Sequence, residues 1–117
     1  MTIQRHDTGP RMSKAVIHGD TVYLAGIVAE SPKGKSMAEQ TKSILAQIDG
    51  FLAKAGTDKS KLLSANIWIT DMADFAEMNT VYAEYFLSNP PARSTIQVAA
   101  LPKGANVEIE AIASKPT

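Results

Sequence analysis

Two short segments in the last third of the chain carry the side chains best suited to chemistry. Arg93 follows a rigid proline pair, while Glu108 and Glu110 share one face of a segment that otherwise looks internal. A guanidinium grips a carboxylate through two parallel hydrogen bonds. A glutamate can orient a water and take its proton as the water attacks an electrophilic carbon such as that of a C=N bond. The pattern favours recognition of a small carboxylate by Arg93 and water activation by Glu108.

Spacing alone leaves structural interpretations of these residues open. An arginine at a strand end, such as Arg93, is commonly an ion-pair partner. Glu108 and Glu110 are the kind of residues that are commonly solvated or bonded to a neighbouring subunit. Asn79 lies on a predicted helix, where its amide group could equally cap or bridge backbone groups.

Other chemistries find little support in the sequence. The chain has no Cys, which excludes disulfides, thiolate nucleophiles and zinc sites built on Cys ligands. His6 and His18 have no carboxylates at a matching spacing, so we expect no metal site. Ser94 and Thr95 lack a histidine partner for a hydroxyl nucleophile, and no glycine-rich phosphate loop is present.

The length of the chain favours a single domain, and its balanced charge argues against binding to polyanions. The 117 residues, 44% of them apolar, suffice for one hydrophobic core, so residues 1–117 are treated as a single domain. Lys and Arg number 12, as do Asp and Glu, so no net charge draws the chain to nucleic acid or to a membrane surface. The apolar runs are too short for a signal peptide or a membrane span. We expect a cytoplasmic protein.

The first half of the chain predicts a hairpin followed by a helix. Residues 14–18 and 21–25 are rich in β-formers and are joined by Gly19 and Asp20, a hairpin signal. Ser36 and Glu39 form a capping box that should open a helix. Gly56 should close it, because glycine readily takes the left-handed conformation after a helix. The apolar positions of this helix recur every three or four residues: Ile44, Leu45, Ile48, Leu52 and Ala55.

The second half predicts a strand, a helix and two more strands. Residues 62–70 alternate, with Leu63, Ala65, Ile67 and Ile69 on the apolar face. Asp71 should cap a helix over residues 73–87, which the segment 89–91 stops. Strands are expected over 94–101 and 106–114, separated by the turn 102–104, and a short strand near 3–5 is a further option. The second helix should offer five residues to the interior: Phe75, Met78, Tyr82, Tyr85 and Phe86.

This order of elements predicts an α+β domain of two layers, a mixed sheet with two helices packed on one face. The other face should carry Trp68, either Ile96 or Thr95, and Ile112, so we expect neighbouring copies of the chain to cover it. If the last two strands pair as a hairpin, Arg93 lies near one end of the pair and Glu108 close to its turn. An interface between copies would bring the two side chains into one cleft.

The motifs together resemble those of the RidA-like (YjgF/YER057c/UK114) family of reactive intermediate deaminases over nearly the whole chain. The most specific part is an arginine fifteen residues before the first glutamate of the closing strand. The matching segments are residues 24–26, Gln40 and Thr41, residues 70–75, Asn79, residues 91–94 and residues 107–113.

The resemblance implies a chorismate-mutase-like fold and a homotrimer with three clefts between subunits. It also implies that Arg93 binds the substrate carboxylate, that Glu108 positions the hydrolytic water and that Asn79 supports the site. The family chemistry uses no metal or organic cofactor. Water attacks the C=N carbon of a 2-imino acid, such as 2-iminobutanoate or 2-iminopropanoate, formed from an enamine, and the adduct expels ammonia to leave a 2-keto acid.

Three positions of the implied substrate pocket depart from the family pattern. Arg11 follows Gly9 and Pro10 where well-studied deaminases have a tyrosine, Ala25 stands in place of a serine, and Thr95 often in place of a cysteine. The resemblance therefore points to a divergent subgroup with an altered pocket wall. Two alternatives to imine hydrolysis stay open: a non-catalytic trimer that binds small carboxylates or a protein, and a ribonuclease or translation inhibitor, which the balanced charge disfavours.

Overall fold

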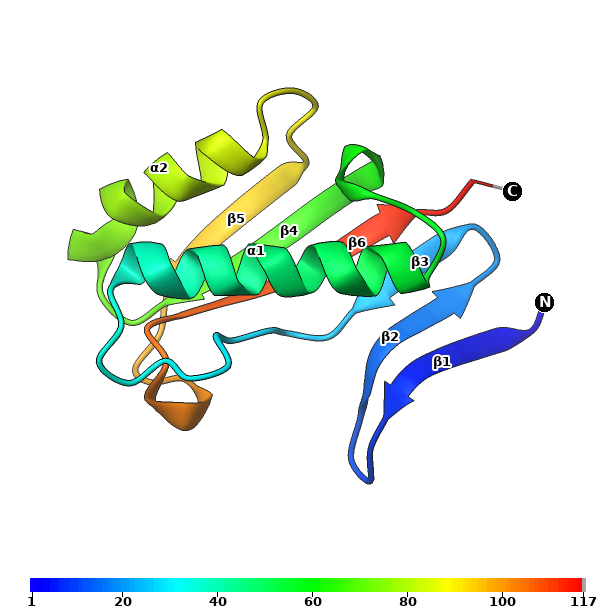
Figure 1. Ribbon diagram of the computed structural model, residues 1–117, viewed down its shortest axis with the longest axis horizontal. Helices are drawn as coiled ribbons and strands as arrows, with labels where there is room; N and C mark the ends of the chain where they lie inside the picture. The colour runs from blue at the N-terminus through cyan, green and yellow to red at the C-terminus, as the bar shows by residue number, and fades with distance from the viewer. Residues whose placement is uncertain (117) are drawn as a thin grey trace.

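Six strands and two helices build the protein in two layers (Figure 1). The computed structural model describes residues 1–116. The expected α+β architecture, with both helices on one face of a mixed sheet, is confirmed. The elements are β1 (Ile3–Thr8), β2 (Ser13–His18), β3 (Thr21–Leu24), α1 (Met37–Lys54), β4 (Leu62–Ile69), α2 (Phe75–Tyr85), β5 (Ala92–Gln97) and β6 (Val107–Ser114), with short 3-10 helices η1 (Lys59–Lys61), η2 (Met72–Asp74) and η3 (Pro102–Gly104).

The strand order is β1-β2-β3-β6-β4-β5, and only the pair of β4 and β5 is parallel. A hairpin of the last two strands is therefore wrong, because β4 lies between β5 and β6. The reason is the connection through α2, which carries the chain across the sheet as a parallel crossover requires. The chain then returns through η3, and β6 pairs antiparallel with both β3 and β4.

The predicted hairpin and first helix are confirmed at nearly the expected residues. His18 pairs with Thr21 across a two-residue turn, in which Gly19 takes a positive φ of 64° that suits glycine. The Oγ of Ser36 accepts a hydrogen bond from Glu39 N at 3.1 Å, and Ser36 N donates to Glu39 Oε1 at 3.0 Å, which completes the capping box. The apolar stripe of α1 is buried as expected.

Three predicted details differ in the structure. Leu63 is 54% exposed instead of buried, because the register between β4 and β6 shifts between Leu62 and Ser64 and places Leu62 in the core. Asp71 caps η2, not α2, accepting from Ala73 N at 2.9 Å, so α2 begins only at Phe75. The strand after α2 starts and ends earlier than expected, at Ala92 and Gln97.

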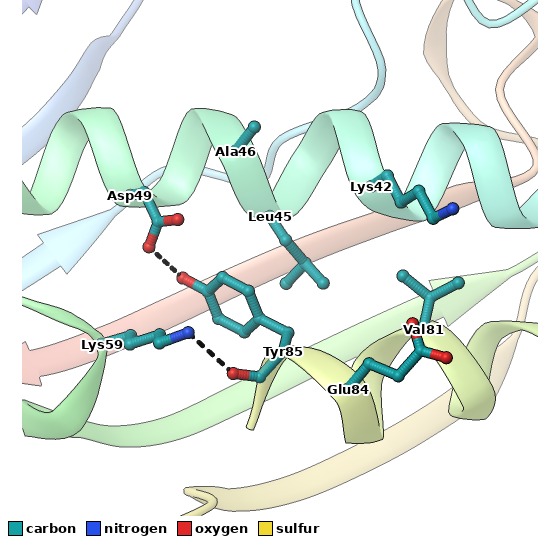
Figure 2. Close-up of a pocket in the computed structure, with 8 residues that line it drawn as sticks. All are labelled: Lys42, Leu45, Ala46, Asp49, Lys59, Val81, Glu84 and Tyr85. Atoms are coloured by element: carbon teal, nitrogen blue, oxygen red, sulfur yellow. Dashed lines mark hydrogen bonds between the residues drawn. The ribbon is translucent and has the colours of Figure 1, made fainter. Parts of the chain in front are cut away.

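A tyrosine and a lysine tie the end of α2 to its surroundings, as Figure 2 shows. Tyr85 donates its hydroxyl to Asp49 of α1 at 2.5 Å, and Lys59 Nζ donates to the carbonyl oxygen of Tyr85 at 2.9 Å. These contacts border a cavity of about 370 Å³ between the two helices. Within residues 1–116, neither helix is long and apolar enough to cross a bilayer.

Gln40 is a fully buried polar residue that ties the first turn of α1 to the start of β6. Its Nε2 donates to the carbonyl oxygen of Lys35 at 3.0 Å and to Oδ1 of Asn106 at 2.9 Å. Its Oε1 accepts from the backbone N of Asn106 at 2.9 Å. Asn106 also donates through Nδ2 to Thr70 Oγ1 at 3.1 Å, next to the end of β4. This network fixes the strand that carries Glu108 two residues further on.

The Gln40→Met variant should lower the free energy of unfolding by about 2 to 3 kcal/mol. The methionine keeps the side-chain length but leaves the backbone N–H of Asn106 without its partner inside the protein. Urea denaturation of the variant measures the loss, with Gln4→Met on the exposed strand β1 as the matched control. Equal stability of the two variants would contradict the assigned role of Gln40.

Candidate functional site

Glu108 lies on the face of the sheet that the helices leave uncovered. Along β6, buried and half-buried residues alternate, so Val107 and Ile109 point into the core while Glu108 points away from it. Its carboxylate lies directly over Gly26. A β-carbon at position 26 would come within 3.0 Å of Glu108 Cδ and closer still to its Oε2. Gly26 therefore makes room for this carboxylate.

The surroundings of Glu108 favour its protonated form. Burial is the larger cause that raises the pKa of Glu108 above its ordinary value, and the neighbouring charge of Glu110 is the second. Glu110 itself accepts a hydrogen bond from Nδ2 of Asn66 at 3.1 Å. A carboxylate with a raised pKa holds a proton more readily, as a general base must when it deprotonates a water.

Glu108 shares a cavity of about 390 Å³ with one of the predicted pocket residues, Arg11. Gly26, Lys14 and Lys103 also line it. We call the residues Glu108, Gly26, Arg11, Lys14 and Lys103 the glutamate half-site. Ala25 does not line the cavity, but it adjoins it, because its backbone N donates to the carbonyl oxygen of Lys14 at 2.9 Å.

Arg93 lies on the opposite, helix-covered side of the sheet. Its partner in the parallel register is Ala65, a core residue, so the two side chains share the face beneath α2. The guanidinium carbon is 4.8 Å from the ring centroid of Tyr82 and 5.6 Å from that of Phe75, distances typical of cation–π contacts. Within residues 1–116 the guanidinium has no carboxylate at ion-pair distance. The interpretation of Arg93 as an ion-pair partner therefore finds no partner within residues 1–116.

Three buried side-chain oxygens on the same face have no hydrogen-bond partner within residues 1–116. They are Oδ1 of Asn79, the hydroxyl of Tyr82 and Oγ1 of Thr95. Asn79 and Tyr82 are three residues apart on α2, and Thr95 follows Arg93 by two residues on β5. Leaving a buried polar atom unpaired costs about 1 to 3 kcal/mol, so such a group calls for an explanation. We call Arg93, Tyr82, Phe75, Asn79 and Thr95 the arginine half-site.

Tyr82 was expected only as a core residue, and its contact with the guanidinium was missed. Its spacing of three residues from Asn79 was the available signal in the sequence. Burial raises the pKa of Tyr82, although the charge of Arg93 opposes the shift, so the hydroxyl stays protonated and can donate a hydrogen bond. Lys14, Lys103 and Gly26 were likewise not predicted as neighbours of Glu108.

A single chain does not bring Arg93 and Glu108 together. The two residues lie on opposite faces of the sheet, and their strands are separated by β4. The structure places Arg11 with Glu108, and Asn79 and Thr95 on the face of Arg93. Within one chain the predicted site is therefore divided into two halves.

The cavity between the helices in Figure 2 contains none of the predicted site residues, and no metal-binding cluster is found in the described residues. The helix cavity contains none of Arg11, Ala25, Asn79, Arg93, Thr95 and Glu108. In the described part of the chain, no three His, Asp or Glu side chains gather closely enough to hold a metal ion. The absence of a cofactor stays a prediction.

Comparison with known proteins shows one consistent set of relatives. The family model described as endoribonuclease L-PSP matches residues 2–115. The 2-iminobutanoate/2-iminopropanoate deaminase of Bos taurus is 42% identical over 106 residues, 86% of this chain and 77% of the relative. A RutC family protein of Haemophilus influenzae is 39% identical over 115 residues, 97% of this chain and 99% of the relative.

The fold agrees with these relatives. The crystal structure of a YjgF family member from Neisseria meningitidis superposes with a TM-score of 0.93 at 39% identity, covering 100% of this chain and 98% of the other. The family model and the superposed fold thus each cover nearly the whole chain. The chain belongs to the YjgF/YER057c/UK114 (RidA-like) family.

Proposed function

We propose that the protein is a hydrolytic deaminase that converts reactive 2-imino and enamino acids to 2-keto acids and ammonia. The observation that carries the proposal is Arg93, a guanidinium held over aromatic rings with no carboxylate partner inside residues 1–116. Such a group is suited to the carboxylate that every 2-imino acid carries. The name of the bovine relative, a 2-iminobutanoate/2-iminopropanoate deaminase, supports the same substrate class.

The two half-sites would act together in an assembly of identical chains. One face of the sheet exposes Tyr23 and Ile96, at 46% and 55%, beside the half-buried Trp68 and Ile112. A second copy that covers this face would remove apolar surface from water. We propose a homotrimer with three clefts, in each of which the arginine half-site of one subunit faces the glutamate half-site of its neighbour. Its location in the cytoplasm stays a prediction.

The proposed reaction begins with the substrate carboxylate on the guanidinium of Arg93. The hydroxyls of Tyr82 and Thr95 can donate further hydrogen bonds, and Oδ1 of Asn79 can accept one from the substrate N–H. Ionised Glu108 takes a proton from a water as the water oxygen bonds to the C=N carbon and the C=N π electron pair moves to nitrogen, and Glu108 then gives this proton to the nitrogen. Glu108 next takes the hydroxyl proton of the adduct and passes it to the amine; the keto group forms as the C–N bond breaks, ammonia leaves and the carboxylate is restored.

A non-catalytic trimer that binds small carboxylates is the second candidate. It is favoured by the family resemblance itself, which implies an altered pocket wall at Arg11, Ala25 and Thr95. This candidate uses the same Arg93 but needs no ionised Glu108. Ribonuclease activity, which the description of the family model names, is not proposed, because the 12 basic residues are matched by 12 acidic ones.

The Arg93→Ala and Glu108→Gln variants should both lose imine hydrolysis. Loss of the guanidinium should lower kcat/KM about 100-fold, and loss of the base should lower kcat by about 10² to 10⁴-fold. The measurement is release of ammonia from 2-iminopropanoate generated in the assay by an amino acid oxidase. Arg5→Ala and Glu84→Gln, both exposed outside the half-sites, are the matched controls.

Two results would decide against the deaminase. Full turnover in both variants would remove Arg93 and Glu108 from the mechanism. A wild-type rate no higher than the uncatalysed rate, combined with carboxylate binding that Arg93→Ala abolishes, would establish the non-catalytic candidate instead.

The activity should fall as the pH drops through a pKa above 4.5, the ordinary value for Glu, because Glu108 acts in its ionised form and its pKa is raised. Glu110→Gln removes the like charge that contributes to this rise. The acid limb of the profile of kcat/KM against pH should therefore move to lower pH in Glu110→Gln and stay in place in Glu84→Gln. An unchanged acid limb in Glu110→Gln would show that another group titrates.

The Gly26→Ala variant should lower kcat about tenfold or more with nearly unchanged stability. The new β-carbon displaces the carboxylate of Glu108, the far end of a flexible side chain, and the proton transfer depends on its position. Steady-state kinetics and thermal unfolding measure the two effects. Normal kcat in Gly26→Ala, or a large loss of stability, would contradict the assigned role of Gly26.

A further inference from the structure

Three basic residues from separate parts of the chain line the cavity that contains Glu108. Arg11 lies in the loop between β1 and β2, Lys14 on β2 and Lys103 in η3. The loop precedes β2 and η3 precedes β6, and both strands begin at the lower end of the sheet in Figure 1, although about ninety residues separate the two segments in sequence. The fold, not the local sequence, brings these positive charges to one place.

None of the three cations forms an ion pair within residues 1–116, and they outnumber the carboxylates that line the cavity by three to two. The cavity also holds Glu30 and Glu108, but neither lies within the 4.0 Å that defines an ion pair with any of the three cations. Within residues 1–116 the recorded ion pair is that of Lys54 with Asp7, and none of the three cations takes part in it. Like charges around one cavity repel each other and attract an anion.

The backbone of Lys103 has a left-handed conformation. Its backbone has a φ of 60°, a left-handed conformation that costs a residue with a β-carbon about 1 to 2 kcal/mol. Gly104 follows with a φ of 68°, so this turn is built around an unusual backbone. A lysine where glycine or asparagine would be less strained indicates that its side chain is used.

We propose that this cavity binds a second acidic group of the substrate, so that the preferred substrate is a 2-imino dicarboxylate. The inference rests on the proposed function and specifies its substrate class. Arg93 of one subunit holds the carboxylate next to the C=N carbon, and Arg11, Lys14 and Lys103 of the neighbour hold the distal carboxylate. A cavity of about 390 Å³ is within the usual size of small-molecule sites.

Binding of stable keto acids tests the cavity without any need for turnover. Isothermal titration calorimetry compares 2-oxobutanoate, with one carboxylate, with 2-oxoglutarate, with two. We expect 2-oxoglutarate to bind about tenfold or more tightly, from hydrogen bonds to charged groups. A third ligand, 3-phosphoglycerate, distinguishes a distal phosphate from a distal carboxylate, and its tighter binding would overturn the carboxylate assignment.

Two variants connect the preference to the cations. Arg11→Gln removes one charge, and Lys103→Asn removes another with a residue type that tolerates the left-handed backbone. In each variant, the Kd for 2-oxobutanoate divided by the Kd for 2-oxoglutarate should fall toward one. Lys61→Ala, outside the cavity, should keep the wild-type ratio. Equal affinity of the wild type for both keto acids, or an unchanged ratio in Arg11→Gln and Lys103→Asn, overturns the inference.

Kinetics separates this inference from the deaminase proposal. The kcat/KM of the wild type for an imine made from glutamate should exceed that for the imine made from alanine, and both variants should reduce the difference. One outcome separates the two: no imine is hydrolysed, but the wild type prefers 2-oxoglutarate and Arg11→Gln and Lys103→Asn lose this preference. The deaminase proposal then fails and the anion subsite stands.

Discussion

The alternation of side chains across a sheet with one covered face is the constraint on which the functional account depends. Residues in β6 alternate between the core and the uncovered side, so the buried Val107 and Ile109 force Glu108 outward. In β5, pairing with the core residue Ala65 turns Arg93 the other way, beneath α2. A guanidinium and a carboxylate fixed on opposite faces cannot act on one small molecule within one chain. The proposed chemistry therefore requires a second copy.

Both half-sites contain groups that cost stability. The raised pKa of Glu108 means that the folded state favours its protonated form, so the stabilisation present at acid pH is lost as the pH rises through that pKa. Across the sheet, Asn79, Tyr82 and Thr95 hold buried oxygens without partners. The packing of α1 and the network between Gln40 and Asn106 supply the rigidity that holds these groups in place.

Local signals in the sequence predicted the elements, whereas the pairing of distant segments was less accessible. The capping box at Ser36 and the glycine at 56 fixed the ends of α1, because each works through contacts a few residues away. The hairpin of β5 and β6 was wrong, because the crossover through α2 determines the strand order and leaves no local trace. The exposure of Leu63 depends on a register shift that alternation alone cannot reveal.

The residues of the candidate site likewise divide into those that the sequence predicted and those that only the folded chain brings together. Arg93 and Glu108 stood out by residue type, and the family resemblance added Asn79, Thr95, Ala25 and Arg11. Lys14 and Lys103 become neighbours of Glu108 only after folding, so no spacing in the sequence points to them. The role of Gly26 likewise depends on a contact across eighty-odd residues, which is visible only in three dimensions.

Subunit mixing tests the central claim, that each site joins Arg93 of one chain to Glu108 of another. Arg93→Ala and Glu108→Gln chains, each inactive alone, are unfolded, mixed in equal amounts and refolded together, and imine hydrolysis is then measured. If the site is shared between subunits, random assembly restores both residues in about a quarter of the clefts and recovers activity in proportion. If one chain supplied both residues, every mixed assembly would stay inactive, and that result would contradict the account.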